Sequence, residues 1–497
     1  MADSINKNIF SVYIASLIPA GLTYLFWIVV SNYTNSEVIG VIAAIGSFSM
    51  VLGVLSNFDI GVGMKRFLGK AIAEKQFPLF KQITSTAIIF TLTTSTSILI
   101  IVLNPFVNIL EIVGIGKQFI PIIIAIVIGN DLQHIFIGSL ISSLKSKSIV
   151  IPTIISSVSR FVVLFALFFV IGASELTVAL AYSMSYLVIC ILLFIVTIKY
   201  LKKIEGPFFY ETRNNLKLIV KGSFARWFPQ IISVLGSQLS VLAVFSLKGA
   251  SESGLFYIPF AIFNVLFLVS GAINQVSHPV LSGMKEPERQ IQFLKKALKM
   301  AFLGTMPFAA IMFFYAKPIL SIFGTEYSGS SEILSILLYI FPIAIITEGV
   351  YFFLFARGDY KNVLVLGLIS NIPRIILYFI LVPEYGGVGG AIAFIVGTGF
   401  QFILTVILLE KEKIRLEYGM FAIISIIPFL LGYLFEFFKF GFIGVILLFI
   451  LSLIIYLRIK AINEDDIENI FVIIMQKERA TKVKNELVKK LKKIHVI

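Results

Sequence analysis

The sequence carries few side chains that could do chemistry, and the most unusual of them are ionisable groups inside long apolar runs. Asp131 and Arg160 flank a turn near residue 146, each about fifteen residues away from it. At a rise of 1.5 Å per residue they reach a similar depth in a helical hairpin. Glu348 and Arg374 flank a turn near 359–360 in the same way. The spacing predicts two acid–arginine pairs, which either neutralise buried charge or line a water-filled cavity.

A second pattern is a polar stripe along one later apolar run. Its members recur at intervals of four, three, four and three, and they are Arg226, Gln230, Ser233, Ser237 and Ser240. The next run adds Asn274, His278 and Ser282 at a spacing of four. Such stripes predict either hydrogen bonds between helices or the wall of a hydrophilic cavity.

These residues divide by charge into two candidate roles in a cavity. The expected contacts to an anionic substrate are Arg226, Arg160, Arg374, Gln230, Asn274 and His278. Arg226 leads this set because a guanidinium can hold phosphate oxygens through two parallel hydrogen bonds, although an arginine near a membrane surface can also extend to lipid headgroups. The expected ion-coupling residues are Asp131, Glu348 and Asp59, and Asp59 alternatively only marks a turn before a basic loop.

Motifs for catalysis or cofactor binding are absent from the sequence. There is no GxxxxGK[ST], no HExxH and no GxSxG, and the three histidines are dispersed. The single cysteine, Cys190, excludes a disulfide framework and a cysteine-based metal site. We therefore expect no metal, no cofactor and no enzymatic activity.

The elements that must position these residues are helices that span a membrane. Hydrophobic residues make up 58% of the 497 residues, charged residues 14%, and the mean hydropathy is +0.98. Apolar runs of this length must satisfy their own backbone hydrogen bonds, which predicts an all-α polytopic membrane protein. About fourteen spans are expected, near residues 8–31, 38–64, 82–104, 118–142, 149–172, 176–198, 224–247, 253–284, 300–324, 332–356, 362–382, 387–409, 418–435 and 440–457.

The basic residues predict the orientation of these spans. Of the 41 Lys and Arg, 34 fall on one side, 4 on the other and 3 inside spans. Such a split predicts a multi-pass protein of the cell membrane with both termini in the cytoplasm. The net charge of +14 then reflects topology rather than nucleic-acid binding. The basic tail at 459–497 is expected to lie against anionic membrane lipids.

A shift of 214 residues aligns the sequence weakly with itself. Lys147, Ser156, Arg160 and Leu167 fall on Lys361, Ser370, Arg374 and Leu381. The shift predicts two parallel six-helix lobes, 1–213 and 214–416, around a central cavity. Two further spans at 417–458 and the tail follow them.

Three sequence motifs resemble those of the polysaccharide-biosynthesis flippases. They are NFDIGVGMKR at 57–66, AKPILSIFGTEY at 316–327 and PEYGGVGGAIAF at 383–394. On these motifs the chain resembles the O-antigen branch of the multidrug/oligosaccharidyl-lipid/polysaccharide exporter superfamily.

The resemblance implies alternating access between two lobes. It also implies transfer of a polyprenyl-(di)phosphate-linked oligosaccharide from the cytoplasmic to the outer leaflet, coupled to an ion such as Na⁺ or H⁺. The alternatives are a cation-coupled multidrug exporter and a lipid II-type flippase. A membrane glycan polymerase or ligase fits less well, because the sequence has no large outward-facing loop.

Overall fold

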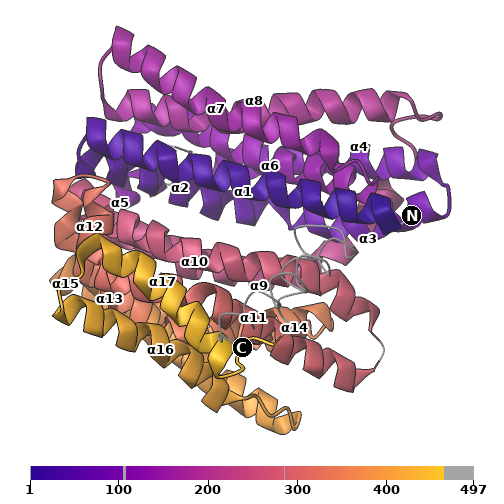
Figure 1. Ribbon diagram of the computed structural model, residues 1–497. Coiled ribbons are helices and arrows are strands. Elements are labelled where there is room, and N and C mark those ends of the chain that lie inside the picture. Colours follow the sequence, from indigo (N-terminus) through magenta and orange to yellow (C-terminus); the bar gives the residue numbers. More distant parts are fainter. Residues whose placement is uncertain (1, 105–107, 285, 464–497) are drawn as a thin grey trace. The chain divides into compact units, whose positions relative to one another are not determined.

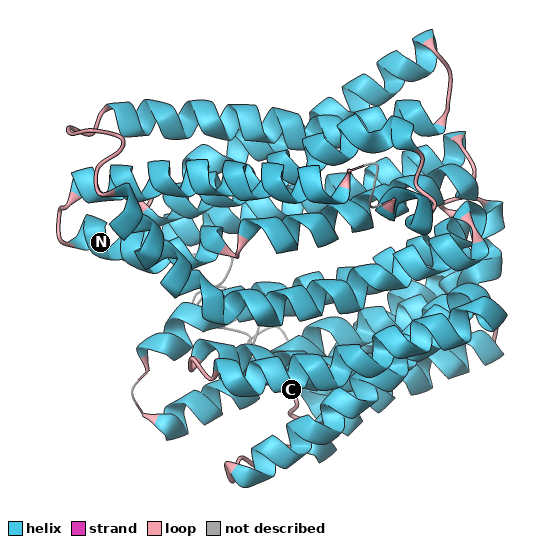
Figure 2. Cartoon of the chain, turned by 180° about the vertical axis from the view of Figure 1, so that it is seen from behind, coloured by secondary structure: helices cyan, strands magenta, loops and turns pink. Residues whose placement is uncertain are grey.

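The computed structural model describes residues 2–104, 108–284 and 286–463, and every regular element in them is a helix (Figures 1 and 2). The first half contains α1 (Ala2–Tyr33), α2 (Ser36–Asn57), α3 (Ile60–Ala73), α4 (Phe77–Val102), α5 (Ile109–Val113), η1 (Lys117–Phe119), α6 (Ile120–Ser142), α7 (Lys147–Val170) and α8 (Glu175–Lys202). The second half contains α9 (Thr212–Lys248), α10 (Ala250–Gly283), α11 (Pro287–Phe314), α12 (Ala316–Ser321), η2 (Thr325–Ser330), α13 (Ser331–Tyr339), α14 (Phe341–Ala356), α15 (Tyr360–Lys411), α16 (Tyr418–Phe437) and α17 (Gly441–Arg458).

The helices confirm a polytopic membrane protein. Among the described residues, 11 helices are long and apolar enough to cross a bilayer, or 12 if η2–α13 and α14, bent by 50°, form one span. α15 has 52 residues and a non-helical Gly386, so it supplies two crossings rather than one. α1 adds the apolar stretch Leu17–Tyr33. These elements are compatible with about fourteen spans.

The second expected span, 38–64, is broken. α2 ends at Asn57, and Phe58 and Asp59 both have left-handed backbone angles, with φ of 50° and 52°. α3 then begins at Ile60. Neither residue is a glycine, so this conformation is strained and must be held by contacts with other helices.

The described chain divides by packing into two compact units. The first comprises Met1–Ile258, Ile322–Tyr327 and Asn371–Ala393, and the second the remaining residues. In the first unit α6 packs against α8, α3, α2 and α4, while α7 packs against α8 and α1. In the second unit α16 and α17 pack against α11, and the rings of Phe302 and Phe421 stack at 4.7 Å. This division does not test the predicted repeat boundary at 213/214, which stays a prediction.

Side-chain contacts gather the predicted cytoplasmic loops of the first unit at one end. The Lys81 ammonium donates to the carbonyl oxygens of Ile204 and Gly206 at 2.9 and 2.8 Å. The Lys145 ammonium lies 3.6 Å from the centre of the Tyr200 ring. Three basic loops therefore share one end of the unit, as the charge distribution predicts.

The predicted outer loops gather in the same way. Asn32 donates to the carbonyl of Ile322 at 2.9 Å, and Ser36 donates to Glu326 at 3.0 Å. The backbone N–H of Gly387 donates to Glu252 at 2.9 Å. The motifs at 316–327 and 383–394 therefore contribute turns that tie helix ends together.

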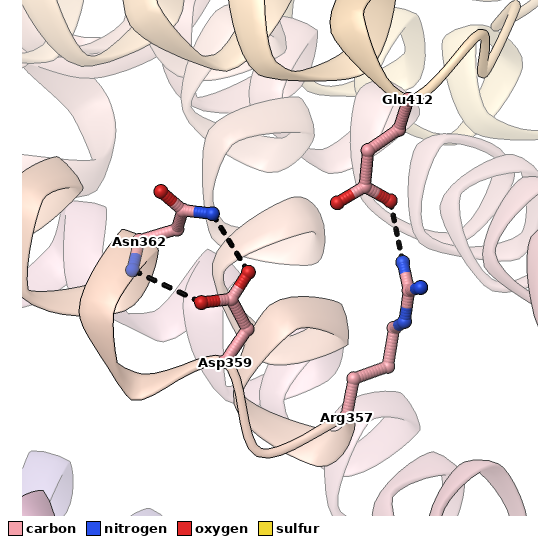
Figure 3. A network of polar contacts seen from close by, with 4 residues as sticks. All are labelled: Arg357, Asp359, Asn362 and Glu412. Carbon is pink, nitrogen blue, oxygen red and sulfur yellow. Dashed lines mark hydrogen bonds and ion pairs between the residues drawn. The ribbon is translucent and has the colours of Figure 1, made fainter.

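The second unit has a polar junction at the turn between α14 and α15 (Figure 3). The Asp359 carboxylate caps α15 by accepting from the backbone N–H of Asn362 at 3.2 Å and from its side-chain amide at 2.7 Å. Arg357 forms an ion pair with Glu412, which lies at the far end of α15. The pair places the basic loops 357–361 and 411–415 on one side, as predicted.

Candidate functional site

Asp131 lies in the middle of α6 and is fully buried. Its Oδ2 accepts hydrogen bonds from the hydroxyls of Ser56 and Ser95, both at 2.6 Å. Its Oδ1 faces the side-chain amide of Asn57 at 3.4 Å. These donors come from α2 and α4. The predicted pair with Arg160 is therefore wrong, because α6 turns the carboxylate away from α7.

Arg160 lies on α7 and is also buried, with 8% of its surface exposed. Its Nη1 donates to the hydroxyl of Thr23 on α1 at 3.0 Å, and its guanidinium lies 5.6 Å from the centre of the Phe26 ring. Its Nε is buried without a hydrogen-bond partner. Within the described residues, no carboxylate pairs with Arg160. The positive charge is thus available to a ligand.

Arg160 forms part of the wall of a cavity of about 320 Å³ within the first unit. The cavity lies among α1, α6, α7 and α8, and its lining includes both polar and apolar side chains. The polar ones are Arg160, Gln133, Thr153, Ser156, Ser157, Ser185 and Tyr186. The apolar ones are Ala15, Pro19, Ile137, Ile141, Ile149 and Ile189. An arginine beside hydroxyls and aliphatic side chains suits an anion attached to an apolar group.

Arg226 and Asp59, predicted for different roles, form an ion pair. Arg226 Nε lies 2.9 Å from Asp59 Oδ2, and both side chains are largely buried. Arg226 projects from α9 to the break between α2 and α3, where Asp59 sits. The charge of Arg226 is therefore balanced within the protein in this structure, in contrast to that of Arg160.

Trp227, which sequence reasoning missed, holds the same break. Its indole ring stacks on Phe58 with centroids 4.1 Å apart. Its Nε1 donates at 2.7 Å to the carbonyl oxygen of Val54, in the last turn of α2. Adjacent residues of α9 thus bind both left-handed residues of the break.

The motif at 57–66 supplies the other contacts of this junction. Asn57 accepts the backbone N–H of Asp59 at 2.8 Å. A Cβ on Gly61 would lie 2.7 Å from the carbonyl oxygen of His134 on α6, and one on Gly63 would lie 2.0 Å from the hydroxyl oxygen of Ser223 on α9. Two glycines two residues apart, between a broken span and a basic loop, were the available signal for this close packing.

The polar stripe of α9 divides into two parts. Gln230 and Ser233 are exposed, so in a membrane they must face water or another polar surface. Further along, Ser240 is buried and donates to the carbonyl of Ser237 at 2.6 Å. The hydroxyl of Tyr378 on α15 donates to the carbonyl of Gly236 at 2.9 Å. The stripe thus serves helix packing at one end and is open at the other.

Arg374 is buried on α15 and donates to the side-chain oxygen of Asn371 at 3.1 Å. Glu348 is half-buried on α14. The two residues fall in different compact units, so their predicted pairing stays a prediction.

The side chains of Asn274 and His278 lie outside the described residues, although α10 itself extends over both positions. Among the described residues, no group of three or more His, Cys, Asp or Glu side chains gathers as a metal site.

Comparison with known proteins gives relatives of low identity. No family model matches the chain. An uncharacterized membrane protein of Methanocaldococcus jannaschii is 21% identical over 82% of this chain and 99% of its own length. The capsular polysaccharide biosynthesis protein CapF of Staphylococcus aureus is 28% identical over 33% of this chain and 43% of its own length. A Shigella flexneri protein named for O-antigen transport is 26% identical over 49% of this chain and 57% of its own.

The solved structures define the fold. The lipid II flippase MurJ in an inward closed conformation has a TM-score of 0.73 at 16% identity, covering 90% of this chain and 98% of that one. An inward-facing MATE transporter of the MOP superfamily has a TM-score of 0.64 at 15% identity, covering 82% and 98%. The fold is therefore that of membrane flippases and multidrug transporters. Together with the polysaccharide-related relatives, it supports the flippase family recognised in the sequence motifs.

Proposed function

We propose that this protein is a flippase for oligosaccharides linked to a polyprenyl phosphate or diphosphate. It moves them from the cytoplasmic to the outer leaflet of the cell membrane by alternating access, with both termini in the cytoplasm and an ion as the driving partner. The names of two relatives, one for O-antigen transport and one for capsular polysaccharide biosynthesis, support a glycan substrate.

The observation that carries the proposal is that Arg160, in an amphipathic cavity, has no carboxylate partner among the described residues. Within the same residues its buried Nε has no hydrogen-bond partner, and its Nη1 donates to the neutral hydroxyl of Thr23. A phosphate would accept from this guanidinium in the forked geometry that arginine favours. The nearby serine and threonine hydroxyls would bind the remaining phosphate oxygens.

The apolar side chains that line the cavity suit the lipid portion of the substrate. Ile141 and Ile149 flank the turn between α6 and α7, at the end predicted to face the cytoplasm. A substrate made in the cytoplasmic leaflet would reach Arg160 from this end. Arg374 would bind an anionic group in the second half of the chain, and the exposed Gln230 and Ser233 would contact sugar hydroxyls.

The test is translocation by the full chain in liposomes. A fluorescent polyprenyl-diphosphate oligosaccharide is supplied, and its appearance in the opposite leaflet is measured. Arg160→Ala should lower the rate about tenfold or more, because a hydrogen bond to a charged group contributes roughly 1.5–3 kcal/mol. Arg160→Lys should keep part of the rate, since it retains charge but loses the fork.

Arg289→Ala is the matched control, because Arg289 is an exposed arginine that pairs with Glu286 on the surface. This variant should flip the substrate at the wild-type rate. Wild-type rates from Arg160→Ala, at equal protein incorporation, would refute the role of the cavity.

The same liposomes separate the alternative functions. Lipid II, an O-antigen-type lipid-linked oligosaccharide and a cationic drug are compared at equal concentration. Preference for lipid II would assign the chain to the function named for MurJ, and drug transport alone would assign it to the multidrug exporters. Preference for the oligosaccharide is expected.

A further inference from the structure

The surroundings of Asp131 show a carboxyl group built into the protein interior without a countercharge. Its side chain is fully buried, and a Cβ on Gly53 would lie 3.1 Å from its Oδ1, so a larger residue there would crowd it. The three groups that donate to it, from Ser56, Ser95 and Asn57, are all neutral. Among the described residues, no Lys or Arg forms an ion pair with Asp131. An isolated carboxylate in such a place is costly, and binding a proton or another cation removes that cost.

The hydrogen bonds suit a proton better than a metal ion. Both Asp131 oxygens face donors, whereas a bound metal ion needs oxygen lone pairs directed toward it. Asn57 cannot turn its oxygen to a metal, because that oxygen already accepts the N–H of Asp59 at 2.8 Å. Ser56 has a second acceptor, the carbonyl of Gly53 at 3.1 Å. When Asp131 is protonated, the Ser56 hydroxyl can donate to Gly53 and accept from Asp131.

A second observation marks a polar interior beside this site. Thr91 lies one turn before Ser95 on the same face of α4, and its hydroxyl is fully buried without a hydrogen-bond partner. Thr84, two turns earlier on that face, accepts from Ser139 of α6 at 3.3 Å. Buried hydroxyl groups are therefore spaced along the interface between α4 and α6, from Asp131 to the end of α4 that contains Lys81.

Asn57 connects Asp131 to the break between α2 and α3. Its amide group faces Asp131, and its oxygen fixes the backbone of Asp59. The Asp59 carboxylate pairs with Arg226, and Trp227 beside it stacks on Phe58. A change in the charge of Asp131 alters the strength of its interaction with the Asn57 amide. Because Asn57 also binds the backbone of Asp59, this change alters how firmly the strained left-handed residues at the break are held.

We propose that Asp131 is a proton-binding site whose occupancy sets the conformation of the α2–α3 break and its contact with α9. Deprotonated Asp131 holds Asn57 and the break as seen here, and protonation releases them. The site deepens the proposed function by naming a proton as the driving ion, but proton binding itself can be measured without any transported substrate.

Other titratable or charged groups stand on the elements around this part of α6. They are His134 on α6, Glu37 on α2, Asp59 at the break, Lys65, Arg66 and Lys70 on α3, Lys81 on α4, and Glu175, Tyr182, Tyr186, Lys199, Tyr200 and Lys202 on α8. Arg226 on α9 forms an ion pair with Asp59. His134 is the main competitor, because an imidazole ordinarily titrates between pH 5 and 8.

The two tryptophans of the chain, Trp27 and Trp227, make a direct measurement possible. In a Trp27→Phe background, Trp227 emission reports the break alone. Its emission in detergent is followed against pH and should move between two plateaus. Asp131→Asn should stay at the low-pH plateau throughout, because asparagine mimics the neutral acid.

Two control variants should keep the pH dependence of the Trp227 emission if the proposal holds. Glu111→Gln removes an exposed carboxylate that pairs with Lys117, and His134→Gln removes the competing imidazole. Replacing Na⁺ by choline at constant pH and ionic strength should leave the emission unchanged. Loss of the titration in His134→Gln, its persistence in Asp131→Asn, or a response to Na⁺ that Asp131→Asn abolishes would each overturn the proposal.

A second readout covers the case in which Asp131→Asn does not fold. The infrared band of a protonated carboxyl group should appear in the Trp27→Phe protein with the same midpoint as the Trp227 signal. Ser56→Ala should shift both midpoints together, because it removes a donor to the anion. Different midpoints for the two signals would refute the link between protonation of Asp131 and the conformation of the α2–α3 break. Failure of glycan transport with these results intact would count against the proposed function only.

Discussion

At the scale of single residues, the ion pair of the α2–α3 break explains two polar residues that the sequence leaves ambiguous. Asp59 lies at the break and Arg226 on α9, and both side chains are largely shielded from solvent. Each charge is tolerated in this apolar setting because the other balances it. The pair also contributes to holding Asp59 in its left-handed backbone conformation.

A double-mutant cycle tests this pair. Asp59→Asn and Arg226→Gln should each lower the free energy of unfolding by about 2 kcal/mol, since each leaves a charged group without its partner. The double variant should lose clearly less than the sum of the singles. Denaturant unfolding in detergent, followed by circular dichroism, gives the values. Simple additivity of the two losses would show that the residues do not interact.

At the scale of elements, the contact between α3 and α6 depends on glycine. A Cβ on Gly138 of α6 would lie 2.4 Å from the carbonyl oxygen of Gly61. The helix after the break can therefore lie close to α6 only while both positions lack side chains. This approach keeps Asn57 within reach of Asp131.

Gly138→Ala should destabilise the protein by about 1–3 kcal/mol, because the methyl group forces the two backbones apart. Gly69→Ala in α3 is the control, since nothing lies within 4 Å of its Cβ position. It should stabilise α3 by up to about 1 kcal/mol, the ordinary difference between alanine and glycine in a helix. Thermal unfolding of both variants in the same detergent measures the contrast, and equal effects would argue against the close approach.

At the scale of the whole molecule, the loops sort into two sets that agree with the charge distribution. Lys81 and Lys145 join basic loops to each other, while Asn32 and Ser36 join predicted outer loops. The basic set is expected in the cytoplasm, because positively charged loops are retained there during insertion.

Single cysteines in a Cys190→Ser background test this orientation. Cysteines at Tyr33, Gly329 and Glu384, all exposed, should react with an impermeant thiol reagent added to intact cells. Cysteines at Gln76 and Glu286, also exposed, should react only after the cells are opened. Gly386 is avoided as a labelling site because its φ of 54° and its contact with Glu252 leave no room for a side chain. The opposite labelling pattern would invert the topology.

The sequence alone determined that this is a polytopic helical membrane protein of the flippase and exporter fold. Span length and hydropathy are local properties, so a helix can be recognised before its neighbours are known. Polar residues inside apolar runs are also visible in the sequence alone, so Asp131 and Arg160 were singled out as candidates before their neighbours were known.

Only the tertiary structure decided which polar groups meet. Asp131 and Arg160 were predicted to pair from their spacing along a hairpin, but their side chains point in different directions around the helix axes. Asp131 points to α2 and α4, whereas Arg160 points to α1. The break at Phe58 and Asp59 was equally hidden, because phenylalanine rarely adopts a left-handed backbone. The contacts with Arg226 and Trp227 come from α9, more than 160 residues along the chain. Pairings over such separations follow from helix packing, which local sequence patterns do not encode.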